Sequence, residues 1–516
     1  MRESLIYYSI RVFGFMMRIL PVSLAIWIGK RIGMFAYYFD GKHKSLAYAN
    51  LKFAFAHCKS PKEIKQITKQ LFKNYGRNLI ELFRMPLLTP QKFDQVLTVK
   101  GKENVIKGLE GGKGVIMLAM HFGSWELASF SCMMIGFPYK VFVKPQKKYS
   151  RLDDLLNSYR SCGGSVVLSR GSGTRDVIRS LKNNDVIGMV VDQGGRDGVL
   201  VPFLGRKAAM SVGAIRMGLK LGIPICFSVI FRENGSRHKM IIHKSFELEN
   251  TGNLDEDIAS NLKKVTEVME SYVYKYPSEY MWFYKIWKYS DESHITILGD
   301  GKIGHLRQAE SVAQTIRAAL GERNIEAKIE IVNVVFKNQF LARLFSLMSA
   351  VIHPVFYQGR LECLREFLAE DSYKRIVSSK TNFVVSCGSS LAGVNNLLAK
   401  DSNAKSVSIL KPGLLNYRHF DLVVLPKHDE LKKRGVKGRF VITHAAPNLI
   451  DDEYLLQQSN KLLGRYSHLK DYHKMKIGLF VGGDAQTVFL SERQMNLLIR
   501  QIKGVLEEIK NLFKWG

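Results

Sequence analysis

The chain has 516 residues, more than one hydrophobic core normally holds, which indicates two or three domains. A hydrophobic content of 46% and a charged content of 24% exclude a disordered chain. The net charge of +30 indicates an anionic partner. Without zinc-finger spacing, an RNP-like aromatic motif or a compact basic arm, nucleic acid is a weaker choice than an anionic membrane surface or an acidic carrier protein, and no nucleic-acid partner is expected. The six cysteines form no CxxC pair, which is typical of a reduced, cytosol-facing protein.

Residues 1–95 are predicted to be helical throughout, with an N-cap at Ser60 and Pro61 at the first helical position of one helix. The longest uncharged stretch near the N-terminus covers 11 residues, 19–29, whereas a membrane-spanning helix needs about 20. Residues 1–60 hold nine Lys and Arg against two Asp and Glu. Apolar faces beside basic residues favour helices that lie on an anionic membrane, the alternative being a helical hairpin packed on its own domain.

From about residue 96 the pattern changes to alternating strands and helices, which is typical of an α/β sheet. We expect this α/β domain to extend to residue 290. Its predicted strands are short apolar runs, at residues 114–120, 139–145, 164–169, 185–193 and 222–231.

A second α/β series is predicted for residues 294–475, beginning with a strand and a glycine loop. The remaining strands of the series are expected at 327–335, 382–390, 405–412, 421–427 and 439–448. A helical stretch follows, and the run "KIGLFVGGDA" at 476–485 then predicts another strand and loop. We therefore expect residues 476–516 to be the beginning of a further α/β unit.

The stretch "LAMHFGSWELA" carries the first chemical pattern, with His121 and Glu126 five residues apart. Five residues of helix turn about 500°, so these side chains cannot pair within one helix. They can pair if His121 lies on a loop after a strand and Glu126 lies in the first turn of the next helix, with Gly123 in the turn and Ser124 as N-cap. An imidazole oriented by a carboxylate can act as a general base. A loop after a strand would place it at the edge of the sheet where α/β proteins have their sites. A structural His–Glu pair is the alternative.

These residues and their flanks resemble the bacterial lipid A biosynthesis acyltransferases, the lauroyl and myristoyl transferases, which are similar to lysophospholipid acyltransferases. The resemblance covers residues 1–290 and includes an H-x4-E motif. The similar segments are "LAYANLKFAF", "NYGRNLIELFRMP", "HFGSWELA", "VDQGGRDGVLVPFLGRKAAMSVGAIRMGLKLGIPI" and "YPSEYMWFYKIWK". The resemblance implies that His121 is the base acting on an acceptor hydroxyl and that Glu126 orients it.

The same resemblance implies further substrate-binding residues. Asp192 at a strand end is expected to hold the site by hydrogen bonds, or else to cap its strand. Arg170 and Arg206 are expected to bind phosphate or other anionic groups, and a solvated arginine is the alternative for each. Lys144 stands where the family usually has arginine, and lysine lacks the bidentate fork of arginine, so recognition of the acceptor headgroup is expected to differ. No metal or organic cofactor is implied.

The second chemical pattern is the glycine loop "GDGKIGH". Gly301 and Gly304 permit a close backbone approach, and the following helix offers N–H groups to an anion such as a diphosphate. His305 is a candidate residue of this anion loop. A merely structural turn is the alternative, because the loop lacks the Lys-Ser/Thr pair of a P-loop.

The segments around this loop resemble the mitochondrial fission ELM-type family of GT-B-shaped glycosyltransferase-like proteins. The similar segments are "DGKIGHLRQAES", "VSCGSSLA", "NYRHFDLVVLPKHD", "THAAPN" and "FVGGDA". A GT-B enzyme has two Rossmann-like halves, and the residues after 294 are expected to hold one half and the start of the other. A nucleotide sugar is therefore a possible ligand, and a non-catalytic binding module is the alternative.

The sequence thus predicts a membrane-associated O-acyltransferase at the cytoplasmic face of a bacterial inner membrane, with a helical membrane-associating N-terminus, an acyltransferase α/β domain and a Rossmann-like, half GT-B domain. The donor is expected to be acyl carrier protein or acyl-CoA, and the acceptor a lipid A precursor or related glycolipid. Two alternatives stay open: acylation of another glycolipid or aminolipid, and a non-catalytic glycolipid-binding or scaffold protein.

Overall fold

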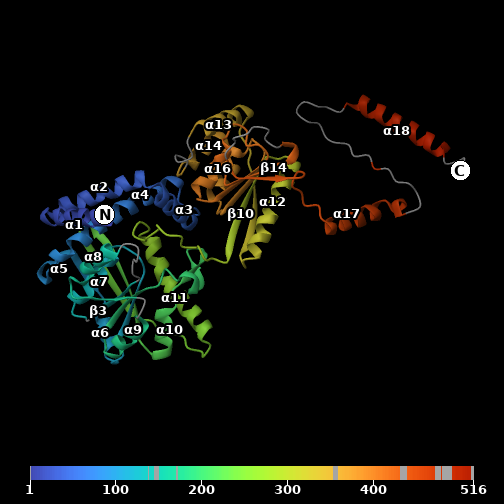
Figure 1. The fold of residues 1–516 in the computed structure, drawn as a ribbon. Coiled ribbons are helices and arrows are strands. Elements are labelled where there is room, and N and C mark those ends of the chain that lie inside the picture. Colours follow the sequence, from blue (N-terminus) through green and yellow to red (C-terminus); the bar gives the residue numbers. More distant parts are fainter. Residues whose placement is uncertain are drawn as a thin grey trace. The chain divides into compact units, whose positions relative to one another are not determined.

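The computed structural model describes residues 2–137, 139–143, 150–169, 173–352, 358–429, 438–470, 478 and 491–512 (Figure 1). Contacts within the chain define two units, Met1–Leu449 and Ile450–Gly516, and each is described by itself. The first unit contains both large sheets and the candidate sites. The borders predicted at residues 95, 290 and 475 stay a prediction.

Helices form the N-terminal part of the first unit, as the sequence predicts. Their bounds are α1 (Arg2–Ile19), α2 (Val22–Phe39), α3 (Gly41–Phe55), α4 (Pro61–Arg84) and α5 (Pro90–Val96), with a 3-10 turn η1 (Met85–Leu87). Ser60 caps α4 in a capping box with Glu63, which confirms the predicted start of this helix. Helices α2 and α4 pack backbone to backbone, because a Cβ added at Gly33 would lie 2.0 Å from the Phe72 carbonyl oxygen.

No described helix combines the length and the apolarity needed to cross a bilayer. The association of these helices with a membrane surface, predicted from their apolar faces and cations, stays a prediction.

A seven-stranded sheet follows, in the order β1-β9-β8-β2-β5-β3-β4. Its strands are β1 (Leu97–Lys100), β2 (Val115–Ala119), β3 (Tyr139–Val143), β4 (Val166–Ser169), β5 (Val186–Val190), β8 (Ile225–Asn234) and β9 (Arg237–Ser245). All neighbours are parallel except β8 and β9. The predicted strands of this region are confirmed, and the mostly parallel sheet brings the carboxyl ends of β2 and β5 side by side.

Helices and a small hairpin surround this sheet. The helices are α6 (Lys102–Leu109), α7 (Trp125–Met134), α8 (Ser150–Ser161), α9 (Gly173–Lys182), α10 (Gly213–Leu221) and α11 (Leu254–Lys275), with the 3-10 turn η3 (Gly195–Asp197). Strands β6 (Val199–Phe203) and β7 (Arg206–Met210) form a separate antiparallel pair.

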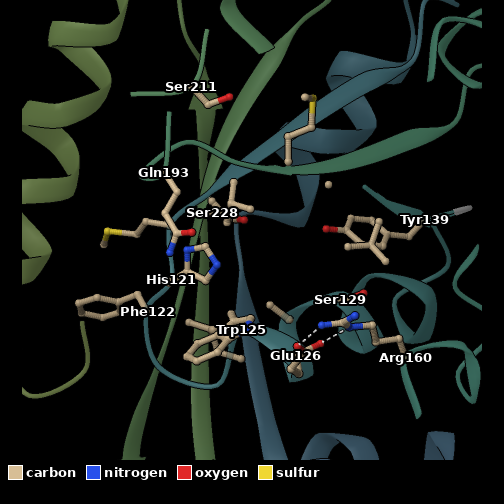
Figure 2. A pocket seen from close by; sticks show the side chains of 18 of the residues that line it. His121, Phe122, Trp125, Glu126, Ser129, Tyr139, Arg160, Gln193, Ser211 and Ser228 are labelled. Atoms are coloured by element: carbon tan, nitrogen blue, oxygen red, sulfur yellow. Dashed lines mark hydrogen bonds and ion pairs between the residues drawn. The ribbon is translucent and has the colours of Figure 1, made fainter. Parts of the chain in front are cut away.

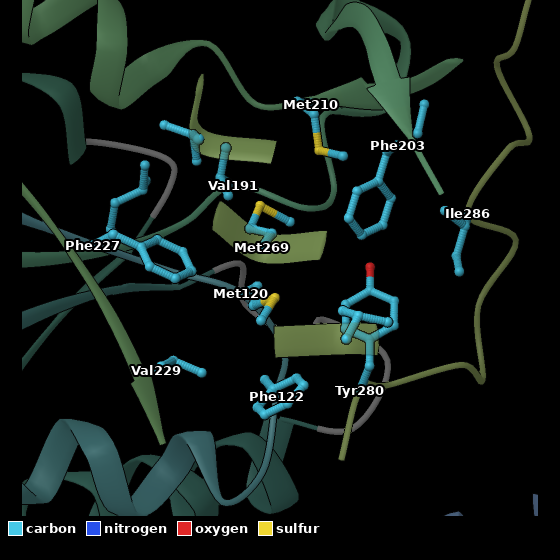
Figure 3. Packing of buried hydrophobic residues seen from close by; sticks show 14 of the residues in the cluster. Met120, Phe122, Val191, Phe203, Met210, Phe227, Val229, Met269, Tyr280 and Ile286 are labelled. Atoms are coloured by element: carbon cyan, nitrogen blue, oxygen red, sulfur yellow. The ribbon is translucent and has the colours of Figure 1, made fainter. Parts of the chain in front are cut away.

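The main core lies directly beneath the carboxyl end of β2. Met120 and Phe122, the neighbours of His121 in sequence, are both buried in it. Figure 3 shows them in one cluster with Phe203 and Tyr280, whose ring centroids are 5.8 Å apart. Phe122 also forms an isolated antiparallel bridge with Tyr280. Because the residues on both sides of His121 are buried in the core, the backbone of His121 is held in place and its loop is rigid.

The second sheet has six strands, all parallel, in the order β11-β10-β12-β13-β14-β15. They are β10 (Glu292–Gly299), β11 (Glu326–Asn333), β12 (Phe383–Cys387), β13 (Lys405–Ile409), β14 (Leu422–Pro426) and β15 (Phe440–Thr443). The chain runs from β10 outward to β11 and then returns to β12 on the other side. In open α/β sheets a ligand crevice lies at such a reversal, at the carboxyl ends of the strands.

The helices of this second region are α12 (Ile303–Gly321), α13 (Gln339–Val351), α14 (Leu364–Phe367), α15 (Glu370–Ser378) and α16 (Ala392–Asp401), with 3-10 turns η5 (Leu361–Cys363), η6 (Tyr417–His419) and η7 (Lys427–Asp429). The predicted mixed α/β architecture with parallel sheets is thereby confirmed for both regions.

The unit Ile450–Gly516 contains α17 (Asp452–Arg465), η8 (Ser467–Lys470) and α18 (Glu492–Leu512). The strand expected at 476–485 falls, apart from residue 478, outside the described residues.

Candidate active site

His121 lies on the loop between β2 and α7. The strand ends at Ala119 and the helix begins at Trp125, which confirms the predicted strand–loop–helix arrangement. Gly123 adopts a φ of 57°, and a Cβ there would lie 2.0 Å from the carbonyl oxygen of Ile230. Only glycine fits this turn without strain. Ser124 occupies the N-cap position, although its side chain makes no capping hydrogen bond.

Three hydrogen bonds hold this loop, two with the main chain of residues 279–281 and one with a side chain of α4. The backbone N–H of Met281 donates to the His121 carbonyl at 3.0 Å, and the N–H of Gly123 donates to the Glu279 carbonyl at 2.9 Å. The amide of Asn78, on α4, donates to the Gly123 carbonyl at 2.7 Å. The loop therefore keeps its shape without a ligand, which is the requirement for a pre-organised catalytic group.

Asp192, two residues after β5, is the carboxylate that holds the imidazole. Its Oδ1 lies 2.8 Å from Nδ1 of His121, and its Oδ2 accepts the His121 backbone N–H at 3.1 Å. The Tyr284 hydroxyl donates to the Asp192 carbonyl oxygen at 3.0 Å. Burial lowers the pKa of His121, but the charge and hydrogen bond of Asp192 outweigh it and leave that pKa above its ordinary value.

Glu126 does not pair with His121, which corrects the sequence prediction. Arg160 on α8 donates to both oxygens of the Glu126 carboxylate, from Nε at 2.8 Å and from an Nη at 2.6 Å. Figure 2 shows this pair apart from the imidazole, with Trp125 beside the His121 ring at a centroid distance of 5.6 Å. Glu126 lies in the first turn of α7, and from there it faces α8 rather than the end of β2.

A cavity of about 610 Å³ opens beside His121. Its walls combine apolar side chains with a few polar ones, the composition of a site for an amphiphilic ligand. The polar residues that line it are His121, Glu126, Ser129, Asp153, Arg160, Gln193, Ser211, Arg216 and Ser228. The apolar lining includes Met120, Phe122, Val141, Leu156, Val177, Met189, Met217, Ile230 and Met240.

Among the remaining predicted substrate-binding residues, Arg206 does not line this cavity. Lys144 and Arg170 lie outside the described residues. Arg206 is buried away from the cavity lining, where its Nε donates to Ser290 at 2.9 Å and its guanidinium covers the ring of Phe53. The expected anion-binding role of Arg206 therefore has no geometric support, because its guanidinium is already engaged by side chains inside the protein.

Sequence reasoning missed Arg160 and Arg216, the two arginines among the described residues that line the cavity. Arg160 lies 34 positions from its partner Glu126, in a helix with no motif around it. Arg216 falls in a segment whose only distinguishing feature in the sequence is the family resemblance. The basic surplus of the chain indicates anion binding in general, but it does not identify individual positions.

The second predicted site, the glycine loop after β10, holds another histidine–aspartate pair. Nδ1 of His305 lies 2.8 Å from Oδ2 of Asp300, and the Ser390 hydroxyl donates to the same oxygen at 3.2 Å. Gly301 has a φ of 83°, and a Cβ added at Gly301 or Gly304 would meet nothing within 4 Å. The structure thus brings the three predicted residues to the junction between the loop after β10 and the first turn of α12.

In the described part of the chain, no three His, Cys, Asp or Glu side chains gather as metal ligands would.

Comparison with known proteins gives two family matches. The sequence model described as bacterial lipid A biosynthesis acyltransferase matches residues 2–289, and the model described as mitochondrial fission ELM1 matches residues 303–513. The first match covers more than half of the chain, and it contains His121, Asp192 and the whole cavity lining.

Individual relatives agree with the first match. A lipid A biosynthesis acyltransferase of Haemophilus influenzae is 20% identical over 268 residues, which are 51% of this chain and 79% of that protein. The lipid A biosynthesis palmitoleoyltransferase of Escherichia coli is 20% identical over 52% of this chain and 86% of its own length. A phosphatidylinositol mannoside acyltransferase of Mycolicibacterium smegmatis is 25% identical over 29% of this chain and 50% of its own. The chain is an acyltransferase and belongs to the bacterial lipid A biosynthesis acyltransferase family.

Proposed function

We propose that the protein transfers a fatty acyl chain from an acyl thioester to a hydroxyl of a lipid A precursor or related glycolipid, with His121 as general base. The observation that carries this proposal is the His121–Asp192 pair at the wall of the cavity. Because Asp192 accepts from Nδ1, the neutral ring keeps its lone pair on Nε2. That nitrogen is the one able to take a proton from an acceptor.

The proposed reaction is a direct acyl transfer. His121 Nε2 removes the proton of the acceptor hydroxyl while its oxygen attacks the thioester carbonyl. The C–S bond of the resulting tetrahedral intermediate then breaks, and the leaving thiolate takes the proton back from the imidazolium. An ester and a free thiol result, and the base is regenerated. Asp192 keeps the ring in the correct tautomer and stabilises the imidazolium that forms.

Glu126 is proposed to act through Arg160. The two side chains form a bidentate pair in the cavity wall, which fixes a guanidinium where an anionic part of the donor or acceptor would lie. In this role Glu126 positions a substrate-binding cation, whereas Asp192 has the orienting role first expected of Glu126.

The helices α1 and α2 are proposed to rest on the cytoplasmic face of a bacterial inner membrane. Large apolar side chains are exposed along both, among them Phe15, Ile19 and Trp27, and Arg11 and Arg31 accompany them. Apolar side chains with cations beside them favour an anionic interface. Deleting α2 would remove the partner of α4, so the appropriate test replaces Phe15, Ile19 and Trp27 with serine and measures release from membranes.

The second sheet is proposed to bind an anionic group at Gly301, Gly304 and His305, with a nucleotide sugar as one candidate. The observation in favour is the His305–Asp300 pair where the loop after β10 meets α12, at the strand reversal. Calorimetric titration of the full chain with nucleotide sugars, and of a His305→Ala variant, tests this. Binding that is absent, or unchanged in the variant, would contradict it.

The acyl-transfer proposal is tested with purified full-length protein. Acyl carrier protein and coenzyme A, each charged with the same fatty acid, are offered with a lipid A precursor that has a free hydroxyl. A new ester, detected by mass, is expected with at least one donor. Lipid binding without any ester would favour the scaffold alternative, and an ester on a mannosylated phosphoinositide alone would favour the other-glycolipid alternative.

A further inference from the structure

Helix α13 exposes a continuous apolar face. Phe340, Leu344, Leu347 and Val351 follow one another at intervals of four, three and four residues, which places them on one side of the helix. All four are exposed, Phe340 to 71% and Val351 to 85%. The opposite side packs inward through Phe345. A surface helix normally exposes polar side chains and buries its apolar ones, so this exposed apolar face indicates a binding partner.

The position of α13 places this face at the carboxyl edge of the six-stranded sheet. The helix follows the end of β11, and a Cβ added at Gly393 would lie 2.5 Å from the Ser349 hydroxyl oxygen. Gly393 belongs to the first turn of α16, three residues after Ser390, which bonds to Asp300. Helix α13 therefore packs beside the β12–α16 connection, which also contributes Ser390 to the His305–Asp300 pair.

Other strand ends add exposed apolar side chains to the same edge. Ile303 follows β10, Val335 follows β11 and Leu414 follows β13, and each is more than half exposed. Because all six strands are parallel, their carboxyl ends meet at one edge. We call the exposed side chains of α13 together with these three residues the α13 edge.

The charges within α13 and the segment that leads into it are positive. Residues 334–352 contain Lys337 and Arg343 and no Asp or Glu, and both cations are exposed. Lys302, beside Ile303, is also exposed. The nearby Asp300 carboxylate is engaged with His305. An apolar surface flanked by cations complements a membrane surface that contains anionic lipid.

We propose that the α13 edge docks on an anionic membrane surface, as a contact separate from the one proposed for α1 and α2. The apolar side chains of α13 enter the boundary between headgroups and acyl chains, while Lys337, Arg343 and Lys302 face the lipid phosphates. The His305–Asp300 pair then lies next to the lipid headgroups, so the ligands within its reach are membrane lipids with polar headgroups.

A local probe tests the docking in the full chain, with the exposed Cys58, Cys162 and Cys363 replaced by serine. An environment-sensitive fluorophore is attached at Leu347→Cys and, as a matched control, at Ala318→Cys on the far end of α12. Vesicles of phosphatidylethanolamine with phosphatidylglycerol should shift the emission at position 347 to the blue and leave position 318 unchanged. Phosphatidylcholine vesicles should have little effect at either position.

Charge variants test the same contact. Lys337→Glu and Arg343→Glu should each weaken the response of the 347 probe to anionic vesicles about fivefold or more, whereas Arg317→Glu on α12 should not change it. A vesicle-bound protein whose 347 probe stays unshifted would overturn this inference and leave the α1–α2 contact intact. A shift that depends on protein concentration without vesicles, pointing to a second copy, would overturn it too, as would an equal shift with neutral vesicles.

Discussion

Each of the two sheets carries a histidine paired with an aspartate at a strand end, and both Nδ1–carboxylate distances are 2.8 Å. The carboxylates differ in origin. Asp192 comes from a neighbouring strand, 71 positions away, and its side chain is fully buried. Asp300 lies in the loop after β10, and His305 lies five positions further on, in the first turn of α12. The first pair therefore depends on the whole fold, and the second depends mainly on one loop–helix junction.

The surrounding packing sharpens this difference. The His121 loop lies against β8 so tightly that Gly123 has no room for a Cβ, whereas nothing lies within 4 Å of a Cβ at Gly304. His121 lines a cavity with its side chain 19% exposed, and His305, at the start of α12, is exposed to 25%. A clamped histidine beside a cavity suits chemistry that must exclude water, because an acyl thioester is open to hydrolysis. A pair beside uncrowded backbone suits binding of a ligand at the strand ends.

The largest expected effect comes from replacing each of the two histidines with alanine. His121→Ala should lower kcat/KM for acyl transfer about 100-fold or more, the usual loss when a general base is removed. His305→Ala should leave the same reaction within about twofold of wild type, since it lies in the other sheet. Initial rates with one donor and one acceptor give both numbers, and equal losses would contradict the division of roles.

The aspartates provide the next comparison. Asp192→Asn should lower kcat about tenfold to a hundredfold, because an amide does not stabilise the imidazolium. It should also move the acidic limb of the pH–rate profile to lower pH, since Asp192 holds the pKa of His121 above its ordinary value. Asp300→Asn should change neither quantity. If Glu126→Gln moves this limb and Asp192→Asn does not, Glu126 is the orienting carboxylate after all.

The two loops should differ in their tolerance of a single methyl group. Gly123→Ala places a Cβ 2.0 Å from a carbonyl oxygen, at a positive φ, and should lower the free energy of unfolding by about 2–3 kcal/mol. Gly304→Ala fills open space within α12 and should leave it unchanged or slightly raised. Denaturant unfolding measures both, and a destabilised Gly304→Ala would show that the start of α12 is also tightly packed.

The smallest effect concerns Glu279, whose carbonyl clamps the first loop. Burial raises the pKa of its carboxyl to about 7, and its Oε2 is buried without a hydrogen bond. The neutral Glu279 carboxyl contributes fully to the free energy of unfolding below pH 4.5. This contribution is lost as the pH rises through 7, because the carboxyl ionises more easily in the unfolded chain than in the folded one. Glu279→Gln should therefore raise the free energy of unfolding by about 1–2 kcal/mol at pH 8 and by little at pH 5. An equal gain at both pH values would contradict the raised pKa.

The sequence was sufficient to predict the local elements that present both histidines. Apolar runs ending at Met120 and Gly299 indicated strands, and glycines after them indicated the turns. It was insufficient for partners that come from distant elements. Residue spacing suggested Glu126 for His121, whereas the strand order of the sheet brings Asp192 there. Arg206 was expected to bind an anionic group because of the family resemblance, with a solvated arginine as the alternative, but the fold buries it against Phe53 and Ser290. Neither outcome is encoded in a short motif.

The most direct test of the central claim is the mass of the lipid A fraction from cells that contain the wild-type chain, the His121→Ala variant or the His305→Ala variant in equal amounts. An additional acyl chain is expected with wild type and with His305→Ala, and it should be absent with His121→Ala. An unchanged acyl pattern with His121→Ala would contradict the assignment of acyl transfer to the first sheet and its buried histidine–aspartate pair.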